Sequence, residues 1–132
     1  TRGVTNELNE YMVEKARDVI EGAARMYDLT VEMKPAAMAV VAESSPELIA
    51  MAERVAATLP SVKKVLPSAP FNASEDITLM MERVQQKGGQ ALITLFGTPT
   101  HGGHHSSSFD ADEAVIRNAA EFYAALQKEI TG

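Results

Sequence analysis

The sequence predicts an α/β fold, because segments with helical spacing of apolar residues alternate with short runs typical of strands. The clearest helix is residues 6–27, where apolar side chains recur every three or four positions opposite an acidic face. The clearest buried strand is the apolar run 90–96, which ends at Gly97 just before all 3 histidines of the chain. Ligands bind beyond the carboxyl ends of strands in α/β sheets, so any chemistry is expected in that loop.

The first 41 residues are predicted to contain one long helix and parts of a sheet edge. Thr5 or Asn6 can cap the helix with a side-chain oxygen. Residues 1–4 are interpreted as the tail of a strand, and residues 29–34 alternate with period two, as a half-exposed strand does before Pro35. One helix and at most two strands are too few to enclose a core. We therefore expect a domain boundary near residues 42–45, dividing 1–41 from 42–132.

The second part is predicted to alternate between helices and strands. Ser45 caps a helix that starts at Pro46, a residue favoured at the first helical position. Asp110 is predicted to cap the last helix, where Glu113 completes a capping box. The remaining predicted elements, in chain order, are a short strand at 62–66, a helix at about 74–86 and the strand 90–96.

Composition restricts the classes of partner and site. The chain has 132 residues, which is room for one ordinary domain or two small pieces of a larger one. A net charge of -6 leaves no basic face for a nucleic acid or an anionic membrane. The absence of Cys excludes disulfides and thiolate zinc sites. No apolar run reaches the roughly 20 residues needed to span a bilayer.

The histidines at 101, 104 and 105 are the first candidates for chemistry, since imidazole is the commonest metal ligand in proteins. The functional interpretation is that one of them, His105 first of all, binds a metal ion. The alternative is a polar, glycine-rich surface loop whose histidines are merely solvated. A catalytic zinc site needs three protein ligands, and this loop can hardly supply them all.

Two further groups have both a functional and a structural interpretation. Acidic residues at the start of the 74–86 helix can orient a ligand or a histidine, but they also favour the helix dipole. An arginine at position 2 can bind a substrate carboxylate through two hydrogen bonds, or it can be a solvated arginine at a strand edge. The residues concerned are Ser74, Glu75 and Asp76 in the first group and Arg2 in the second, and for both groups the structural interpretation is the commoner one.

Several separated motifs together resemble the M20 family of metallo-amidohydrolases, in the branch of aminobenzoyl-glutamate hydrolases and N-acyl amino acid amidohydrolases. They occur in the same order and cover essentially the whole chain. The motifs are TRGVTNELNEYM (1–12), GAARMY (22–27), ASED (73–76), MMERV (80–84), GHH (103–105) and FDADE (109–113).

The resemblance implies a fold made of two pieces of a larger enzyme. Residues 1–41 would be the second half of an α+β lid that dimerises, and residues 42–132 the C-terminal part of an α/β zinc-hydrolase catalytic domain. His105 would be the last ligand of a two-metal site, usually zinc and alternatively manganese or cobalt. Arg2 would bind the carboxylate of the scissile amino acid, and the residues that support the metal ligand would be Ser74, Glu75, Asp76 and His104. The other ligands, the bridging Asp and the catalytic Glu of the family lie in an N-terminal segment, so this chain alone is expected to be inactive.

Two hypotheses follow. The first is the C-terminal portion of a cytoplasmic, metal-dependent amidohydrolase that cleaves N-acyl amino acids or small peptides, with the missing N-terminal catalytic segment and a second copy of the protein as partners. The second is a non-catalytic, helix-rich dimerisation or binding module. Rescue of amidase activity by the upstream segment, and its loss on His105→Ala, would separate the two.

Overall fold

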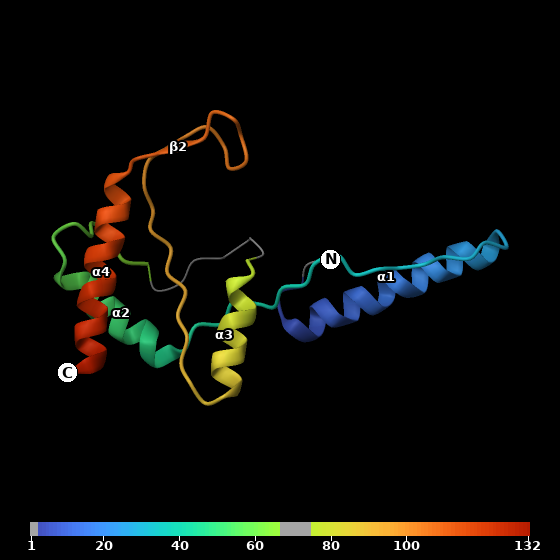
Figure 1. The fold of residues 1–132 in the computed structure, drawn as a ribbon, viewed down its shortest axis with the longest axis horizontal. Coiled ribbons are helices and arrows are strands. Elements are labelled where there is room, and N and C mark those ends of the chain that lie inside the picture. The colour runs from blue at the N-terminus through green and yellow to red at the C-terminus, as the bar shows by residue number, and fades with distance from the viewer. Residues whose placement is uncertain (1–2, 67–74) are drawn as a thin grey trace.

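The structure is a computed structural model that describes residues 3–66 and 75–132. Figure 1 shows two parts, an arm formed by the first helix and a body that holds the other three helices and a small hairpin. The chain leaves the arm, returns along it in extended conformation and enters the body. The elements are α1 (Asn6–Met26), α2 (Pro46–Thr58), α3 (Ile77–Gln86), β1 (Thr100–His101), β2 (Asp110–Ala111) and α4 (Ala114–Thr131).

Helix α1 confirms the predicted long helix and its cap. The Thr5 hydroxyl oxygen accepts a hydrogen bond from the Leu8 amide at 3.1 Å, which satisfies one of the free amides of the first turn. The returning segment is tied to the helix start, because the Val41 amide donates to Asn6 Oδ1 at 2.8 Å. No described residue of α1 is buried, so its apolar stripe has little packing against other described residues. Such packing is the main source of helix stability in proteins.

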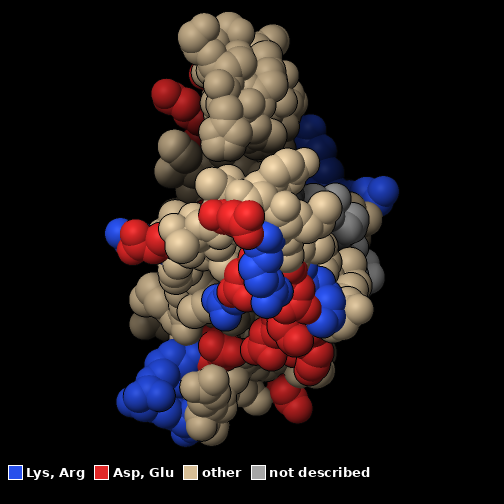
Figure 2. Space-filling view, turned by 90° about the vertical axis from the view of Figure 1, so that its right-hand side faces the viewer, with Lys and Arg blue, Asp and Glu red and all other residues tan. Residues whose placement is uncertain are grey.

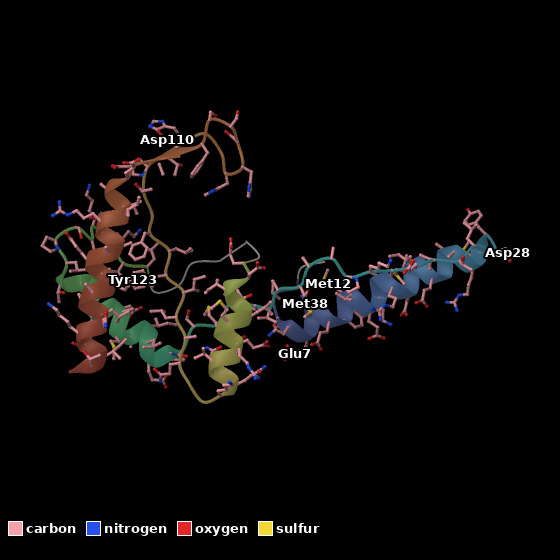
Figure 3. All side chains as sticks on the ribbon, in the orientation of Figure 1. Glu7, Met12, Asp28, Met38, Asp110 and Tyr123 are labelled. Carbon is pink, nitrogen blue, oxygen red and sulfur yellow. The ribbon has the colours of Figure 1, made fainter. Side chains whose placement is uncertain are left out.

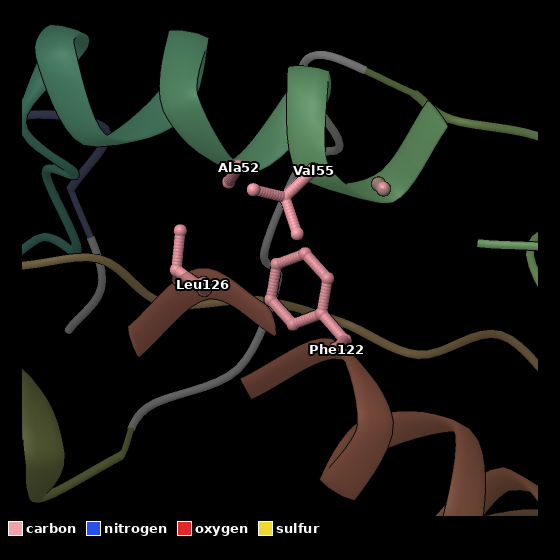
Figure 4. Packing of buried hydrophobic residues seen from close by; sticks show 5 residues of the cluster. Ala52, Val55, Phe122 and Leu126 are labelled. Carbon is pink, nitrogen blue, oxygen red and sulfur yellow. The ribbon is translucent and has the colours of Figure 1, made fainter. Parts of the chain in front are cut away.

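The core lies between α2 and α4, which cross in the body (Figure 4). Phe122 is 4% exposed and lies against Val55 and Ala52 of α2, with Leu126 one turn further along α4. The Phe96 ring meets Phe122 edge to face, with centroids 5.5 Å apart. This small cluster attaches the extended segment before the hairpin to both helices.

Three predicted strands are absent from the described residues. Residues 29–34, 62–66 and 90–96 are extended or irregular but form no ladder. The prediction was wrong because alternation and apolar runs report side-chain preference, whereas a strand also needs the backbone of a neighbouring strand. The recorded hydrogen bonds of the backbone groups of residues 90–96 go instead to the link before α2: the Ser45 amide donates to Ala91 O at 2.8 Å, and Ser44 Oγ accepts from the Ile93 amide at 3.1 Å.

The predicted cap of α2 is right in position but not in its hydrogen bond, and the predicted cap of α4 is wrong. Ser45 stands at the cap position of α2, but its hydroxyl makes no cap hydrogen bond and accepts from the Ala91 amide instead, at 3.1 Å. Asp110 lies in β2, and the free amide of Ala114 at the start of α4 donates to Asp112 Oδ1 at 2.9 Å. The structure places the start of α3 at Ile77. Position 74, the predicted cap of that helix, lies outside the described residues.

The observed architecture is a mixed one, helices with one small antiparallel sheet, which is compatible with the α/β prediction. The total accessible surface is 10511 Å². A compact monomer of 14.2 kDa exposes only about 6,800 Å² by the usual scaling with mass. Large apolar side chains contribute to this excess, for example Val19 at 71% exposed and Met80 at 64%. None of the described helices is long and apolar enough to cross a bilayer.

Candidate functional site

The histidine run lies on the β1–β2 hairpin, at the top of the body in Figure 1. Thr100 pairs with Ala111 and His101 pairs with Asp110 in antiparallel register. The Asp112 amide adds a hydrogen bond to Pro99 O at 3.3 Å just below the pairs. The predicted loop is therefore a hairpin with an eight-residue connection at 102–109, positioned between the extended segment and α4.

Short-range hydrogen bonds fix the path of the connection. The Ser106 amide donates to Gly103 O and the Phe109 amide donates to Ser106 O, both at 3.1 Å. Ser106 Oγ also accepts from the Ser108 amide at 3.1 Å. Gly102 has a φ of +72°, and a Cβ atom there would lie 2.9 Å from Ser108 O. The chain can turn this tightly at Gly102 only because that residue has no side chain.

The two adjacent histidines lie in different surroundings. The His104 ring stacks on the Phe109 ring, with centroids 5.2 Å apart and planes 27° from parallel. His105 has a φ of +64°, in the left-handed region that few non-glycine residues adopt, and its side chain is exposed. The two imidazoles therefore differ in backbone conformation and in recorded ring contacts.

The predicted site residues are only partly brought together. Arg2 and Ser74 lie outside the described residues. Glu75 and Asp76 are exposed at the start of α3, on the side of the body that carries the hairpin in Figure 1. Among the hydrogen bonds and ion pairs recorded for the described residues, none joins either carboxylate to His104 or His105. Their predicted supporting role stays a prediction.

The donor chemistry of His105 fits a metal ion as a single ligand. An exposed imidazole on a short, hydrogen-bonded hairpin offers a ring nitrogen without a competing partner in the recorded contacts of the described residues. The described residues contain no group of three His, Asp or Glu side chains close enough to hold an ion together. A catalytic zinc site needs three protein ligands, and the described residues do not supply such a set.

Charged groups gather away from the hairpin. Figure 2 shows Lys, Arg, Asp and Glu intermixed around the arm that faces the viewer, whereas the uppermost part of the molecule, where the hairpin lies, is largely uncharged. Two side chains of the arm have shifted pKa values. Hydrogen bonds from its own backbone and from Thr5 lower the pKa of Glu7, and the hydrogen bond and charge of Asp18 raise the pKa of Lys15. Both shifts stabilise α1 locally and lie outside the hairpin (Figure 3 labels Glu7 at the start of the arm).

A groove lies below the hairpin, between α2, α4 and the extended segment that precedes β1. Its volume is about 940 Å³, and Ala56, Leu92 and Phe122 are among the apolar side chains that line it. No histidine lines it. It borders the backbone of residues 92–96, which forms no strand ladder in the described structure. The groove is therefore suited to packing a strand or helix rather than to holding a metal ion.

The loop-fixing residues were not identified from the sequence. Gly102, Ser106 and Phe109 acquire their roles through contacts that only the folded hairpin shows. The signal available in the sequence was the aromatic residue that follows the histidines at position 109, inside a motif already noted for its acids.

Comparison with curated proteins gives the class: the chain is homologous to hydrolases over nearly all of its length. It is 43% identical over 126 residues to the indole-3-acetyl-aspartic acid hydrolase of Enterobacter agglomerans. It is 40% identical over 125 residues to one of the subunits of p-aminobenzoyl-glutamate hydrolase from Escherichia coli, and 31% identical over 129 residues to the homologue of that protein in Haemophilus influenzae. These alignments cover 94%, 94% and 98% of this chain.

The chain spans only 29% to 30% of the length of these relatives. No family model matches the chain. No solved structure matches it significantly. The prediction that the chain resembles aminobenzoyl-glutamate hydrolases is confirmed, because two of these relatives are named for that activity. The chain is a homologue of part of such an enzyme.

Proposed function

We propose that this chain is the C-terminal portion of a metal-dependent amidohydrolase. The intact enzyme would cleave the amide bond of N-acyl amino acids similar to aminobenzoyl-glutamate, or of small peptides. The observation that carries the proposal is the 40% and 43% identity, over 94% of the chain, to two hydrolases named for an acyl glutamate and an acyl aspartate. Both substrates have an amide next to free carboxylates, so an enzyme for either must hydrolyse an amide and bind a neighbouring carboxylate.

In this proposal each named residue has a physical task. His105 donates an imidazole nitrogen to one of two divalent metal ions, zinc or alternatively manganese or cobalt, and its exposed place on a rigid hairpin suits it for that task. Such an ion, when bound, activates water and polarises a carbonyl oxygen. A carboxylate from outside this chain accepts the proton of the attacking water. Arg2 binds the substrate carboxylate, and the metal-binding imidazole of His105 is oriented by Ser74, Glu75, Asp76 and His104.

We propose protein partners for this chain because it exposes a large accessible surface. The chain exposes roughly 3,700 Å² more than a compact protein of its mass, which exceeds the 1,200–2,000 Å² of a standard interface. The groove beside residues 92–96 and the uncovered face of α1 both contribute. We propose that the N-terminal catalytic segment covers the groove and that a second copy covers the arm, in a cytoplasmic homodimer. The isolated chain would then be inactive.

The test uses the intact protein and this chain in parallel. Hydrolysis of p-aminobenzoyl-glutamate and of indole-3-acetyl-aspartate is measured by release of the free amino acid, with bound metal counted by atomic absorption. We expect activity in the intact protein, none in the chain alone, and loss of both activity and metal in the intact His105→Ala variant. His101→Ala is the matched control, because His101 is held in the β1–β2 pairing, and it should keep both.

The second candidate is a non-catalytic dimerisation or binding module. The specific observation in its favour is the arm, since no described residue of α1 is buried and its apolar side chains are left uncovered. Two results together would favour this module over the enzyme. The intact protein would hydrolyse neither substrate, and this chain, which contains α1, would still form a dimer.

A further inference from the structure

Two neighbouring imidazoles in the hairpin are held in different ways, and this difference assigns them different tasks. The His104 ring already has a partner, because it lies 5.2 Å from the Phe109 ring at 27° from parallel. No aromatic, hydrogen-bonding or ionic partner is recorded for the His105 ring in the described structure. The stack spans the connection, joining a residue near its start to one at its end.

The stack is the one recorded ring contact across a connection whose other contacts are made by backbone and serine groups. Gly102 lies close to Ser108 at the two ends of the connection, and Ser106 bonds to both Ser108 and Phe109. None of these contacts involves the residues at 104 and 105, which carry the two imidazoles. The aromatic pair adds the flat, apolar contact that keeps the turn between them closed and excludes other loop conformations.

We infer that His104 is a positioning residue, whose ring holds the hairpin closed on Phe109 so that His105 stays at its left-handed backbone angle with its imidazole free for the metal ion. This inference rests on the proposed function of His105 as a ligand. A loop that adopts the binding conformation only part of the time binds its ion more weakly by that fraction. The task of His104 is thus to stack, which requires a flat ring but no nitrogen donor.

The stack itself is tested on this chain without metal. In proton NMR, the ring protons of His104 should show an upfield shift from the Phe109 ring current, and the shift should vanish in Phe109→Leu. The His101 ring protons serve as the internal control, since that residue lies at the base of the hairpin. Ring protons of His104 at unshifted positions in the unsubstituted chain would overturn the inference.

The consequence for metal binding is tested on the intact protein by competition with a chelating dye for Zn²⁺. We expect His104→Ala and Phe109→Leu to weaken zinc binding about tenfold, the lower end of the effect of residues that orient a ligand. His104→Phe restores a flat ring without a nitrogen and should bind zinc within threefold of the unsubstituted protein. His105→Phe should lose at least a hundredfold.

The outcomes distinguish the positioning role of His104 from the metal-binding role of His105. If His104→Phe binds zinc as poorly as His105→Phe, then His104 is itself a ligand and the inference is overturned, while the metal site stands. If His104→Ala binds zinc as well as the unsubstituted protein, the stack has no positioning role. If His105→Phe retains zinc, the proposed function fails and this inference fails with it.

Discussion

Ser45 and Ala91 form a reciprocal pair of hydrogen bonds across 46 positions of the chain. The Ser45 amide donates to Ala91 O at 2.8 Å, and the Ala91 amide donates to Ser45 Oγ at 3.1 Å. Gln85 adds a bond from its side-chain amide to the same hydroxyl at 3.3 Å. This arrangement joins the start of α2, the end of α3 and the extended segment that leads to the hairpin.

Replacing Ser45 by Ala should therefore weaken the body. The Ala91 amide would be left half-buried without its acceptor, which costs about 1–3 kcal/mol in the free energy of unfolding. Urea unfolding followed by circular dichroism measures the change. Ser61→Ala is the matched control, because Ser61 Oγ is buried and has no hydrogen-bond partner among the described residues, so its removal breaks no recorded bond. Equal stability of the two variants would contradict the role given to Ser45.

Gly102→Ala should open the hairpin without unfolding the helices. Alanine at a φ of +72° costs about 1–2 kcal/mol, and its Cβ would meet Ser108 O at 2.9 Å. Hydrogen exchange of the amides in the β1–β2 pairs should accelerate by about tenfold or more. Gly103→Ala provides the comparison, since a Cβ there meets nothing within 4 Å. Faster exchange in Gly103→Ala than in Gly102→Ala would show that the tight turn lies elsewhere.

Phe122→Ala should cost about 3–5 kcal/mol, because it removes the central ring between α2 and α4 and leaves a cavity. A core this small has few other contacts to compensate, so we expect a large fall in the midpoint of thermal unfolding. The same measurement on Ile116→Ala, whose side chain is 68% exposed on the same helix, should change stability by no more than about 0.5 kcal/mol. Comparable losses at the two sites would contradict the packing of α4 on α2.

Acid should weaken the start of α1. The folded helix lowers the pKa of Glu7 below its ordinary value of 4.5, through hydrogen bonds from its own backbone and from Thr5. A lowered pKa means that the carboxylate form favours the helix. This contribution is therefore present above the ordinary pKa and is lost as the pH falls through the lowered one.

The Thr5 part of this effect can be measured separately. In Thr5→Ala, the pKa of Glu7, followed by carbon NMR of its carboxyl group, should rise toward its ordinary value because one of the two hydrogen bonds is lost. Thr131→Ala, which removes a hydroxyl bonded to Gln127 O at the far end of the chain, should leave that pKa unchanged. A Glu7 pKa that is the same in both variants would rule out a contribution from the Thr5 hydroxyl.

Helix positions could be predicted from the sequence because helical hydrogen bonds are local. The Thr5 cap of α1 and the Pro46 start of α2 depend on residues within a few positions, and both were predicted correctly. The same reasoning failed at Asp110, because two acids lie close together there and only the folded chain decides that Asp112 faces the free amide of Ala114. Local rules identify the kind of cap but not always the residue.

By itself the sequence determined the helices, the apolar stripe of α4 and the placement of every histidine after one extended apolar run. It also determined the resemblance to amidohydrolases, since that depends only on the order of motifs. The tertiary structure alone decided that residues 90–96 bond to Ser44 and Ser45 rather than to a strand, and that His104 stacks on Phe109 while His105 stays free. Those contacts join residues that periodicity does not relate, and their geometry exists only once the chain has folded.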